Sequence, residues 1–427
     1  MNIKKNTISH YSVILTTLVI VNAENYNLIL SFIITVLALY GLKKPEEIIP
    51  TFFLTSLASD YFVAFSGVGF TRLFSVILIL SFLLNNPRLI VKKNWLLEIL
   101  FISYATILTY LFSNNMNVYE LLSFVLNILL FLVFVNYEYR EEVLASIFRN
   151  IGISAIIMVI FGGIQLYVNP NFLSNGRLSL NEDLNENRFA MMYSQLSAFL
   201  IGFTFLISSK KIKFIMLSLS GIGIYLVILS GSRSAFLGIL LGTVASIMLL
   251  LIKDKKRRRI LILLPVIGFV GYVFFDWIIS SNELLSYRFN IDQVVSSGGT
   301  RRLPRIITEL KYVIPNNIMF GVGLSANNEF IETAKYMSDP GSSHNIIISM
   351  LAQMGIFGFL AYMSFYFKII KELIHSLKMN VRFIIPIILI LTAMFNGIGE
   401  VIYNDRLFWS ALSLGGLCIN TMKKSLH

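Results

Sequence analysis

The chain has 427 residues, of which 56% are hydrophobic and only 14% are charged, and its mean hydropathy is +0.75. Soluble domains carry about a quarter charged residues, so this composition excludes an ordinary soluble protein. The formal net charge of +12 would suggest nucleic acid as the partner of a soluble protein. Here we interpret the basic residues as topology signals and expect no nucleic-acid partner. The single cysteine, Cys418, excludes a disulfide framework and a cysteine-based metal site.

Apolar runs recur along the whole chain, each near the length that a bilayer requires. They fall at 10–23, 26–42, 48–66, 70–86, 95–112, 118–136, 150–168, 189–207, 212–230, 234–252, 260–280, 344–367, 383–400 and 406–421. Backbone groups in hydrocarbon must be satisfied within their own segment, which favours helices. We therefore predict an all-α, polytopic membrane protein with about fourteen transmembrane helices in one integral membrane domain, 1–427. We interpret Met1 to Lys5 as a basic start to the first span, not as a cleavable signal peptide.

Basic residues occupy every second link between these runs. The links are those that contain Lys4, Lys43, Arg88, Arg140, Lys210, the run from Lys253 to Arg259, the segment from Lys368 to Arg382, and Lys423. The positive-inside rule places these links and both termini in the cytoplasm. The other links then lie on the outer face. They include two long extracytoplasmic loops, 169–188 and 281–343, which we expect to fold back over the membrane core.

The predicted outer face is selectively rich in arginine. It holds only two of the 19 lysines but nine of the 16 arginines. These nine are Arg72, Arg177, Arg188, Arg233, Arg288, Arg301, Arg302, Arg305 and Arg406. A guanidinium group binds phosphate oxygens at two points, which a lysine cannot match, so the bias indicates an anionic ligand. For any one arginine, the alternative is pairing with a local carboxylate, such as Asp183, Glu186 or Asp292, or with a lipid head group.

The second long loop contains a Gly-Gly-Thr turn followed by Arg301, Arg302 and Arg305. Thr300 is predicted to cap a helix that tolerates Pro304 in its first turn, so that Arg301 and Arg305 share one face. Arginine at a helix N-terminus opposes the helix dipole unless an anion is bound there. The pattern therefore predicts a phosphate cradle. The alternative is an amphipathic helix that lies on anionic head groups.

Two further segments place ionisable residues at the membrane boundary. Ser230-Gly231-Ser232-Arg233-Ser234 links two apolar runs so closely that Arg233 stays at the boundary. There a functional role competes with snorkelling to the interface. His344 begins the run after the second long loop, is the one histidine predicted on the outer side, and can act as an acid, a base or a hydrogen-bond donor. No histidine and carboxylate residues show metal-ligand spacing, so we predict no catalytic metal.

Acidic residues lie near the outer ends of several predicted spans. They are Asp60, Glu120, Asp276, Glu400 and Asp405. Carboxylates are costly within a membrane, so we expect Asp60 to pair with Arg72, and Glu400 with Arg406. A catalytic base among these carboxylates is the alternative.

The order and spacing of these motifs resemble the O-antigen ligase/polymerase superfamily over about residues 180–360. The matching elements are Asn185-Glu186-Asn187-Arg188-Phe189-Ala190, Gly231-Ser232-Arg233-Ser234-Ala235, Gly299-Thr300-Arg301, Pro315-Asn316-Asn317 through Gly321-Val322-Gly323, His344-Asn345, and Gly355-Ile356-Phe357-Gly358. Two departures are present. Arg305 stands where the family often has an aromatic residue, and the Asn-Pro order is disturbed.

The resemblance implies a metal-independent, inverting glycosyltransferase with a GT-C-like helical fold and no cofactor beyond a carrier lipid. It implies a bacterial inner (plasma) membrane location, with the active site on the periplasmic or outer face. The donor would be an oligosaccharide linked to undecaprenyl pyrophosphate, and the acceptor a sugar hydroxyl. Membrane lipid and a chain-length regulator protein are further candidate partners.

The resemblance also implies roles for particular residues. Arg233 and Arg301 would stabilise the charge that builds on the departing pyrophosphate, and His344 would position or deprotonate the acceptor hydroxyl. Supporting contacts to the pyrophosphate or glycan would come from Arg302, Arg305, Arg188, Arg177 and Asn345.

Four functions compete with or refine this interpretation. About fourteen spans, as opposed to about twelve, favour a polymerase, whose acceptor is a second lipid-linked repeat unit, over a ligase, whose acceptor is lipid A–core. A lipid-linked oligosaccharide flippase is the alternative from a different class, but its arginines should line a cavity and recur in two related halves. A scaffolding protein predicts no arginine bias.

Overall fold

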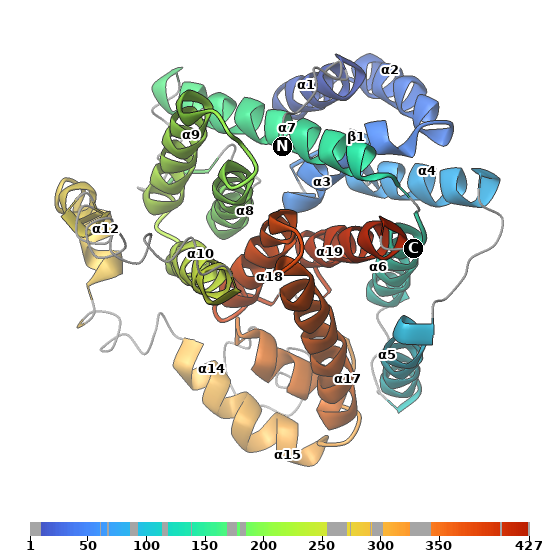
Figure 1. Cartoon of the computed structure of the whole chain (residues 1–427). Coiled ribbons are helices and arrows are strands. Elements are labelled where there is room, and N and C mark those ends of the chain that lie inside the picture. The colour runs from blue at the N-terminus through green and yellow to red at the C-terminus, as the bar shows by residue number, and fades with distance from the viewer. Residues whose placement is uncertain are drawn as a thin grey trace.

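The computed structural model describes residues 10–59, 61–65, 68–85, 93–112, 118–137, 139–168, 177–179, 185–253, 271–273, 275–290, 292, 302–324, 343–401 and 404–425. This part of the chain is built almost wholly from helices, which agrees with the predicted all-α class. Figure 1 shows most of the helices gathered into one bundle, with α8, α18 and α19 at its centre and α12 at its edge.

Most helices of the first part of the chain follow the predicted apolar runs, but α3 ends well before its run does and α7 begins before its run. They are α1 (His10–Glu24), α2 (Leu28–Ala38), α3 (Ile49–Leu57), α4 (Phe70–Asn85), α5 (Lys93–Phe112), α6 (Val118–Asn136) and α7 (Glu141–Val168). Short 3-10 turns cover Leu39–Leu42 and Pro45–Glu47.

The second part contains the central helices and the short helices of the second long loop. They are α8 (Glu186–Thr204), α9 (Lys210–Leu229), α10 (Arg233–Lys253), α12 (Glu283–Phe289), α14 (Arg302–Thr308), α15 (Ile314–Asn316), α17 (Ile346–Leu377), α18 (Ile384–Asn396) and α19 (Arg406–Ser425). A π-helix (Glu309–Val313) joins α14 to α15, and a 3-10 turn (Val381–Phe383) precedes α18.

The predicted span at 48–66 is helical over only part of its length. The apolar run at 48–66 forms α3, which ends at Leu57, and then an antiparallel hairpin of β1 (Val63–Phe65) and β2 (Val68–Gly69). The chain leaves helical geometry at Ala58, where φ is −145°, and the Asn22 amide donates to the Val63 carbonyl at 3.2 Å. Hydropathy alone could not distinguish this hairpin from the end of a helix. Most of the run at 260–280 lies outside the described residues.

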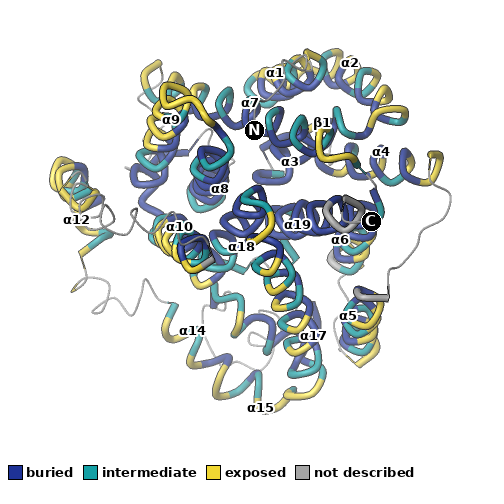
Figure 2. The backbone as a smooth tube through the Cα atoms, in the orientation of Figure 1, coloured by how far each residue is buried: buried dark blue, intermediate teal, exposed yellow. Residues whose placement is uncertain are grey.

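The bundle has a buried core and an exposed surface that is largely apolar. Figure 2 shows α8, α18 and α19 buried, whereas α2, α5 and α12 carry long exposed stretches. In α2 and α5 the exposed stretches are apolar: Ile29 is 72% and Leu97 is 74% exposed. An apolar exterior of this kind suits hydrocarbon, where lipid covers the side chains.

Five helices in the described part of the chain are long and apolar enough to cross a bilayer. They cover Trp95–Phe112, Glu141–Val168, Lys210–Leu229, Arg233–Ile252 and Ile346–Leu377. Shorter apolar helices cover Leu28–Leu42, Phe70–Asn85, Leu121–Asn136 and Val381–Asn396. These lengths suit a helical membrane protein, and the count of fourteen spans stays a prediction.

Contacts join links that were predicted on the same side of the membrane. On the predicted inner side, Arg382 pairs with Glu141 at 3.2 Å and the Asn420 amide donates to the Tyr137 carbonyl. On the predicted outer side, Arg177 and Arg288, one from each long loop, contact the turn between α9 and α10. The sidedness of the links stays a prediction.

Close packing of α10 on α18 depends on glycines. A Cβ atom added at Gly238 would overlap the Asn396 side chain, and one at Gly242 would lie 2.6 Å from the Thr392 nitrogen. Small residues allow helix backbones to approach in this way. This contact holds the start of α10, which bears Arg233, beside the turn that follows α18 (Figure 1).

Helix α17 is broken at Gly355, whose φ of +64° is a left-handed conformation. The Gly321-Val322-Gly323 segment packs against the break. Val322 N–H donates to the Ala352 carbonyl at 2.9 Å, and Ile356 N–H donates to the Ile318 carbonyl at 2.8 Å. Backbone groups freed by the break thus find partners within the protein, as irregular backbone at membrane depth requires.

Candidate functional site

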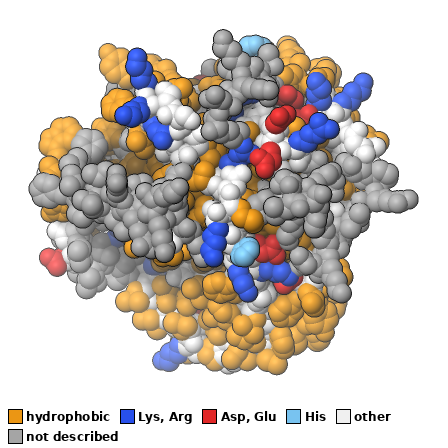
Figure 3. All heavy atoms as spheres, viewed as in Figure 1, with side chains coloured by type: hydrophobic (Ala, Val, Ile, Leu, Met, Phe, Trp, Pro, Cys, Tyr) orange, Lys and Arg blue, Asp and Glu red, His pale blue; other side chains and the backbone are white. Residues whose placement is uncertain are grey.

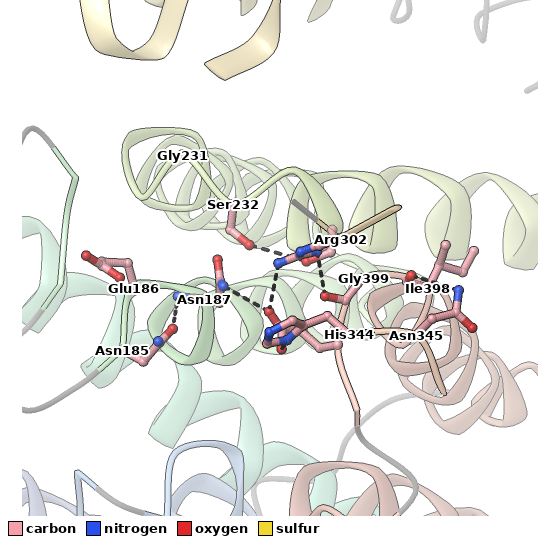
Figure 4. Close-up of polar contacts among 12 residues, drawn as sticks. Asn185, Glu186, Asn187, Gly231, Ser232, Arg302, His344, Asn345, Ile398 and Gly399 are labelled. Carbon is pink, nitrogen blue, oxygen red and sulfur yellow. Dashed lines mark hydrogen bonds and ion pairs between the residues drawn. The ribbon is translucent and has the colours of Figure 1, made fainter. Parts of the chain in front are cut away.

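Glu400, in the turn after α18, connects three segments of the chain. Its Oε2 lies 3.0 Å from His344 Nδ1. Its Oε1 accepts from Asn187 Nδ2 at 2.9 Å and from Arg302 Nη2 at 3.4 Å. The carboxylate is 14% exposed, so these contacts replace most of its hydration. Figure 4 shows the Arg302, His344 and Asn187 side chains converging from three different elements.

His344 is held in a strained backbone conformation immediately before α17. Its φ is +50°, which is uncommon for a residue with a Cβ atom. The next residue, Asn345, caps α17 by accepting from Ile347 and Ile348 N–H, and its amide donates to the Ile398 carbonyl at 3.2 Å. These bonds fix the loop against the 397–400 turn. Strain that the surroundings maintain in this way is typical of functional positions.

The contact with Glu400 favours one tautomer of the His344 imidazole. A carboxylate beside Nδ1 favours the tautomer in which Nδ1 carries the proton and donates it to Oε2. Nε2 is then the basic nitrogen. The arrangement can therefore accept a proton from a hydroxyl group and stabilise the imidazolium that results.

Arg302 begins α14 and reaches the same turn. Its Nη1 donates to the Gly399 carbonyl at 2.8 Å, and its Nη2 lies beside Glu400. A Cβ atom added at Gly399 would lie 2.5 Å from Ser234 Cβ and 3.2 Å from Arg302 Nη1. A glycine is therefore required where α10, Arg302 and the turn meet.

The turn between α9 and α10 receives one arginine from each long loop. Arg177 Nε donates to the Ser230 carbonyl at 2.8 Å, and Arg288 Nε donates to the Gly231 carbonyl at 3.0 Å. Gly231 has φ of +65°, and a Cβ atom there would lie 3.1 Å from Arg288 Cδ and Nε. The glycine of the Ser-Gly-Ser-Arg motif thus permits both the turn and the close approach of Arg288.

Arg177 also ties this turn to the start of α8. Its Nη1 pairs with Glu186 Oε2 at 3.1 Å, and its Nη2 donates to Asn187 Oδ1 at 2.9 Å. Asn187 in turn donates to Glu400. A continuous polar network therefore runs from Arg177 to His344.

We call Arg177, Arg233, Arg288 and Arg302 the arginine cluster. Burial lowers the pKa of Arg177 to about 10; repulsion by Arg288 and Arg302 adds to this effect, and Glu186 and Glu400 oppose it. Burial likewise lowers the pKa of Arg288, against the attraction of Glu186. Arg233 is close enough to Arg288 and Arg302 for the three charges to repel one another. Like charges gathered in a partly desolvated place indicate a site for an anion.

Figure 3 shows the face that bears both termini, with charged side chains near its centre and a broad hydrophobic surface below them. Within the described residues, no group of three His, Cys, Asp or Glu side chains could hold a metal ion.

Most of the predicted site residues come together here. Arg177, Arg233, Arg302, His344 and Asn345 all lie in or beside the network around Glu400 and Gly231. Arg301 and the predicted cap Thr300 lie outside the described residues. Arg305, half-buried, follows Arg302 by about one turn on α14, which continues into a π-helix that the sequence did not predict.

Arg188 has a different partner from the one expected of a ligand-binding residue. It forms an ion pair with Asp405, whose carboxylate also accepts from Leu407 N–H at the start of α19. This pair joins the first turn of α8 to α19. The Arg177–Glu186 pair likewise shows that an arginine can neutralise a nearby carboxylate, which the sequence left open as an alternative.

Four residues of the network were not predicted as site residues from the sequence. They are Glu186, Asn187, Arg288 and Glu400. We expected Glu400 to pair with Arg406, but the structure gives it His344, Arg302 and Asn187 as partners. The expected Asp60–Arg72 pair includes a residue outside those described. Arg288 belonged to the arginine-rich outer set without being assigned to the site.

The fold and the site define a helical membrane protein with a basic site next to a His–Glu pair. Residues 216–363 match the model of a family described as O-antigen ligase. This match confirms the resemblance to the O-antigen ligase/polymerase superfamily and indicates a glycosyltransferase-like function of the O-antigen ligase or polymerase type. A comparison with curated proteins finds no significant match. The matched segment contains Arg233, Arg288, Arg302 and His344, but it excludes Arg177, Asn187 and Glu400.

Proposed function

We propose that this protein is a polysaccharide polymerase that transfers a glycan from undecaprenyl pyrophosphate to a sugar hydroxyl of another lipid-linked repeat unit. The observation that carries this proposal is the arginine cluster beside the His344–Glu400 pair. A cation cluster suits a leaving group that gains negative charge, and an oriented histidine suits a hydroxyl that must lose a proton.

The proposed reaction is one displacement with inversion. The acceptor oxygen attacks the anomeric carbon while the bond from that carbon to the pyrophosphate oxygen breaks. Undecaprenyl pyrophosphate leaves with the bonding electrons, and the acceptor proton passes to His344 Nε2. Glu400 stabilises the imidazolium through Nδ1. Arg233 and Arg302 stabilise the negative charge on the leaving group. Arg301 would do the same, by its place in the motif. No step of this reaction needs a metal ion or a further cofactor.

The second candidate is an O-antigen ligase, and the description of the matching family favours it. A ligase would use the same donor and the same leaving group, but its acceptor would be lipid A–core. We prefer the polymerase because the apolar runs predict about fourteen spans. Both functions share the chemistry of the site and differ only in the acceptor.

The proposal includes a location and partners. The protein would have a GT-C-like fold in the bacterial inner membrane, with both termini in the cytoplasm and the site on the periplasmic or outer face. The extracytoplasmic loops 169–188 and 281–343 would cover that face, since Arg177 and Arg288 reach the α9–α10 turn from them. A chain-length regulator protein is a further candidate partner.

The test uses purified protein in detergent, a synthetic undecaprenyl-pyrophosphate repeat unit and a metal chelator, with the glycans separated on a gel. We expect a ladder that disappears in Arg233→Ala and His344→Ala and persists in Arg72→Ala, which removes an exposed arginine from α4. Transfer that occurs only when lipid A–core is added would identify a ligase. If neither acceptor is used and a fluorescent lipid-linked sugar instead crosses liposome membranes, the enzyme proposal is wrong.

A further inference from the structure

Arg288 differs from the other arginines of the cluster in how its guanidinium group is used. Nε donates to the Gly231 carbonyl at 3.0 Å, and Nη1 and Nη2 form no hydrogen bond or ion pair with the described residues. By contrast, Arg177 uses both Nη atoms on Glu186 and Asn187, and Arg302 uses both on Gly399 and Glu400. Arg288 is thus anchored through one nitrogen, while the end that binds phosphate oxygens in two-point contacts is not occupied by these residues.

The surroundings of Arg288 favour an anion over a protein carboxylate. Its charged neighbours are the carboxylate of Glu186, which Arg177 already engages at 3.1 Å, and the other guanidinium groups of the cluster. The arginine cluster brings four guanidinium groups together at this turn. A diphosphate esterified at both ends keeps one negative charge on each phosphate, whereas a phosphate esterified at both ends keeps a single charge. Two charged phosphates can therefore engage more of these guanidinium groups than one phosphate can.

We propose that Arg288 binds the diphosphate of the lipid donor and makes the site selective for lipid diphosphates over lipid monophosphates. This inference rests on the proposed function and adds to it a binding residue and a criterion for the donor. Anchoring through Nε fixes the guanidinium plane, so less side-chain freedom is lost when the anion binds. The Gly231 turn places this group next to Arg233, so the two can contact neighbouring phosphates.

Direct binding tests this proposal without relying on turnover. The probes are a farnesyl diphosphate and a farnesyl phosphate, each esterified at its other end with the same sugar, so that they carry two and one negative charges. They are titrated into the full-length protein in detergent by calorimetry. The variants are Arg288→Gln and Arg288→Lys, with Arg72→Gln as the matched loss of one exposed arginine. We expect Arg288→Gln to weaken diphosphate binding by about tenfold or more and monophosphate binding much less, since one charge-assisted contact is lost. Arg288→Lys should recover part of the loss, and Arg72→Gln should leave the ratio of the two affinities unchanged.

The outcome that overturns the inference is an unchanged affinity ratio in Arg288→Gln. An equal loss of affinity for both probes, together with a lower melting temperature, also counts as this outcome. It would show that Arg288 only stabilises the turn. Glycan transfer, measured on the same preparations, separates the two proposals. If the wild-type protein transfers glycan and the Arg288→Gln variant keeps the selectivity for the diphosphate, only the inference is contradicted. Wild-type protein that binds the diphosphate selectively through Arg288 but transfers no glycan contradicts only the proposed function.

Discussion

His344 and Glu400 are 56 positions apart in the chain, yet His344 Nδ1 and Glu400 Oε2 lie 3.0 Å apart. The contact joins the residue before α17 to the turn after α18. It is held by bonds on both sides, because Ile346 N–H donates to the Gly397 carbonyl at 2.7 Å and Arg302 reaches both Gly399 and Glu400. The geometry makes Glu400 a positioning residue whose effect should pass through the histidine.

Glu400→Gln should lower kcat for glycan transfer by about 10²-fold or more, while KM for the donor changes little. The amide can still accept a hydrogen bond from Nδ1 but cannot stabilise the charged imidazolium, and general base catalysis contributes about 10²–10⁴-fold. Initial rates at varied donor concentration measure both constants. His344→Ala and the double variant should be about as slow as each other. Strictly additive losses would show that Glu400 acts independently of His344.

Gly399→Ala should lower both stability and activity. The added methyl group would lie 2.5 Å from Ser234 Cβ, and overpacking of this kind costs about 1–3 kcal/mol. Thermal unfolding in detergent and transfer rates give the measurements. The matched control is Gly221→Ala on α9, where an added Cβ meets nothing within 4 Å. Because alanine is the better helix former, the control should be neutral or slightly stabilising. Equal behaviour of the two variants would contradict the packing of α10 on the turn.

Arg188→Gln should destabilise the protein by about 1–3 kcal/mol, because it leaves the Asp405 carboxylate, which is 10% exposed, without its ion-pair partner. Exchanging the charges in Arg188→Asp with Asp405→Arg should recover part of the stability and activity. Denaturation midpoints of the wild type, the two single variants Arg188→Asp and Asp405→Arg, and the double variant test this. If the exchange recovers stability but never activity, Arg188 contacts substrate directly, as the sequence first indicated.

Gly355→Ala should detach the 318–323 segment from α17. A side chain at this position would overlap the Met319 carbonyl oxygen, and the left-handed backbone is itself unfavourable for alanine. Hydrogen exchange of Val322 and Ile356 amides should become faster, with the amides of α8 unaffected. Unchanged protection at these amides would contradict the proposed role of the glycine.

The sequence predicted well those features that depend on local composition. The apolar runs matched α4, α5, α9 and α10 closely, because the length and hydrophobicity of a span are properties of one segment. The Gly231 turn and the neighbourhood of Arg233 were also recognised, since a glycine and serines around a boundary arginine form a local signal. Local motifs likewise identified His344.

What the sequence could not supply were partners that are distant along the chain. Asn187 and Glu400 are 213 positions apart, and no periodicity links them. Glu400 looked like one of several acidic residues at span ends, so its nearest arginine in the chain, Arg406, was the natural expectation. The hairpin after α3 was missed because Val63–Phe65 is as apolar as a helix end. In each case tertiary packing decided what hydropathy left open.

The site draws on residues from 177 to 400, whereas the family match spans 216–363. A chimera that received only the matched segment would inherit Arg233, Arg288, Arg302 and His344. Its residues at the positions of Glu400, Arg177 and Asn187 would come from the host protein. The segment is therefore not a transplantable module. Exchanging acceptor preference between relatives would require grafts that also carry the α7–α8 link, the first turn of α8 and the α18–α19 turn.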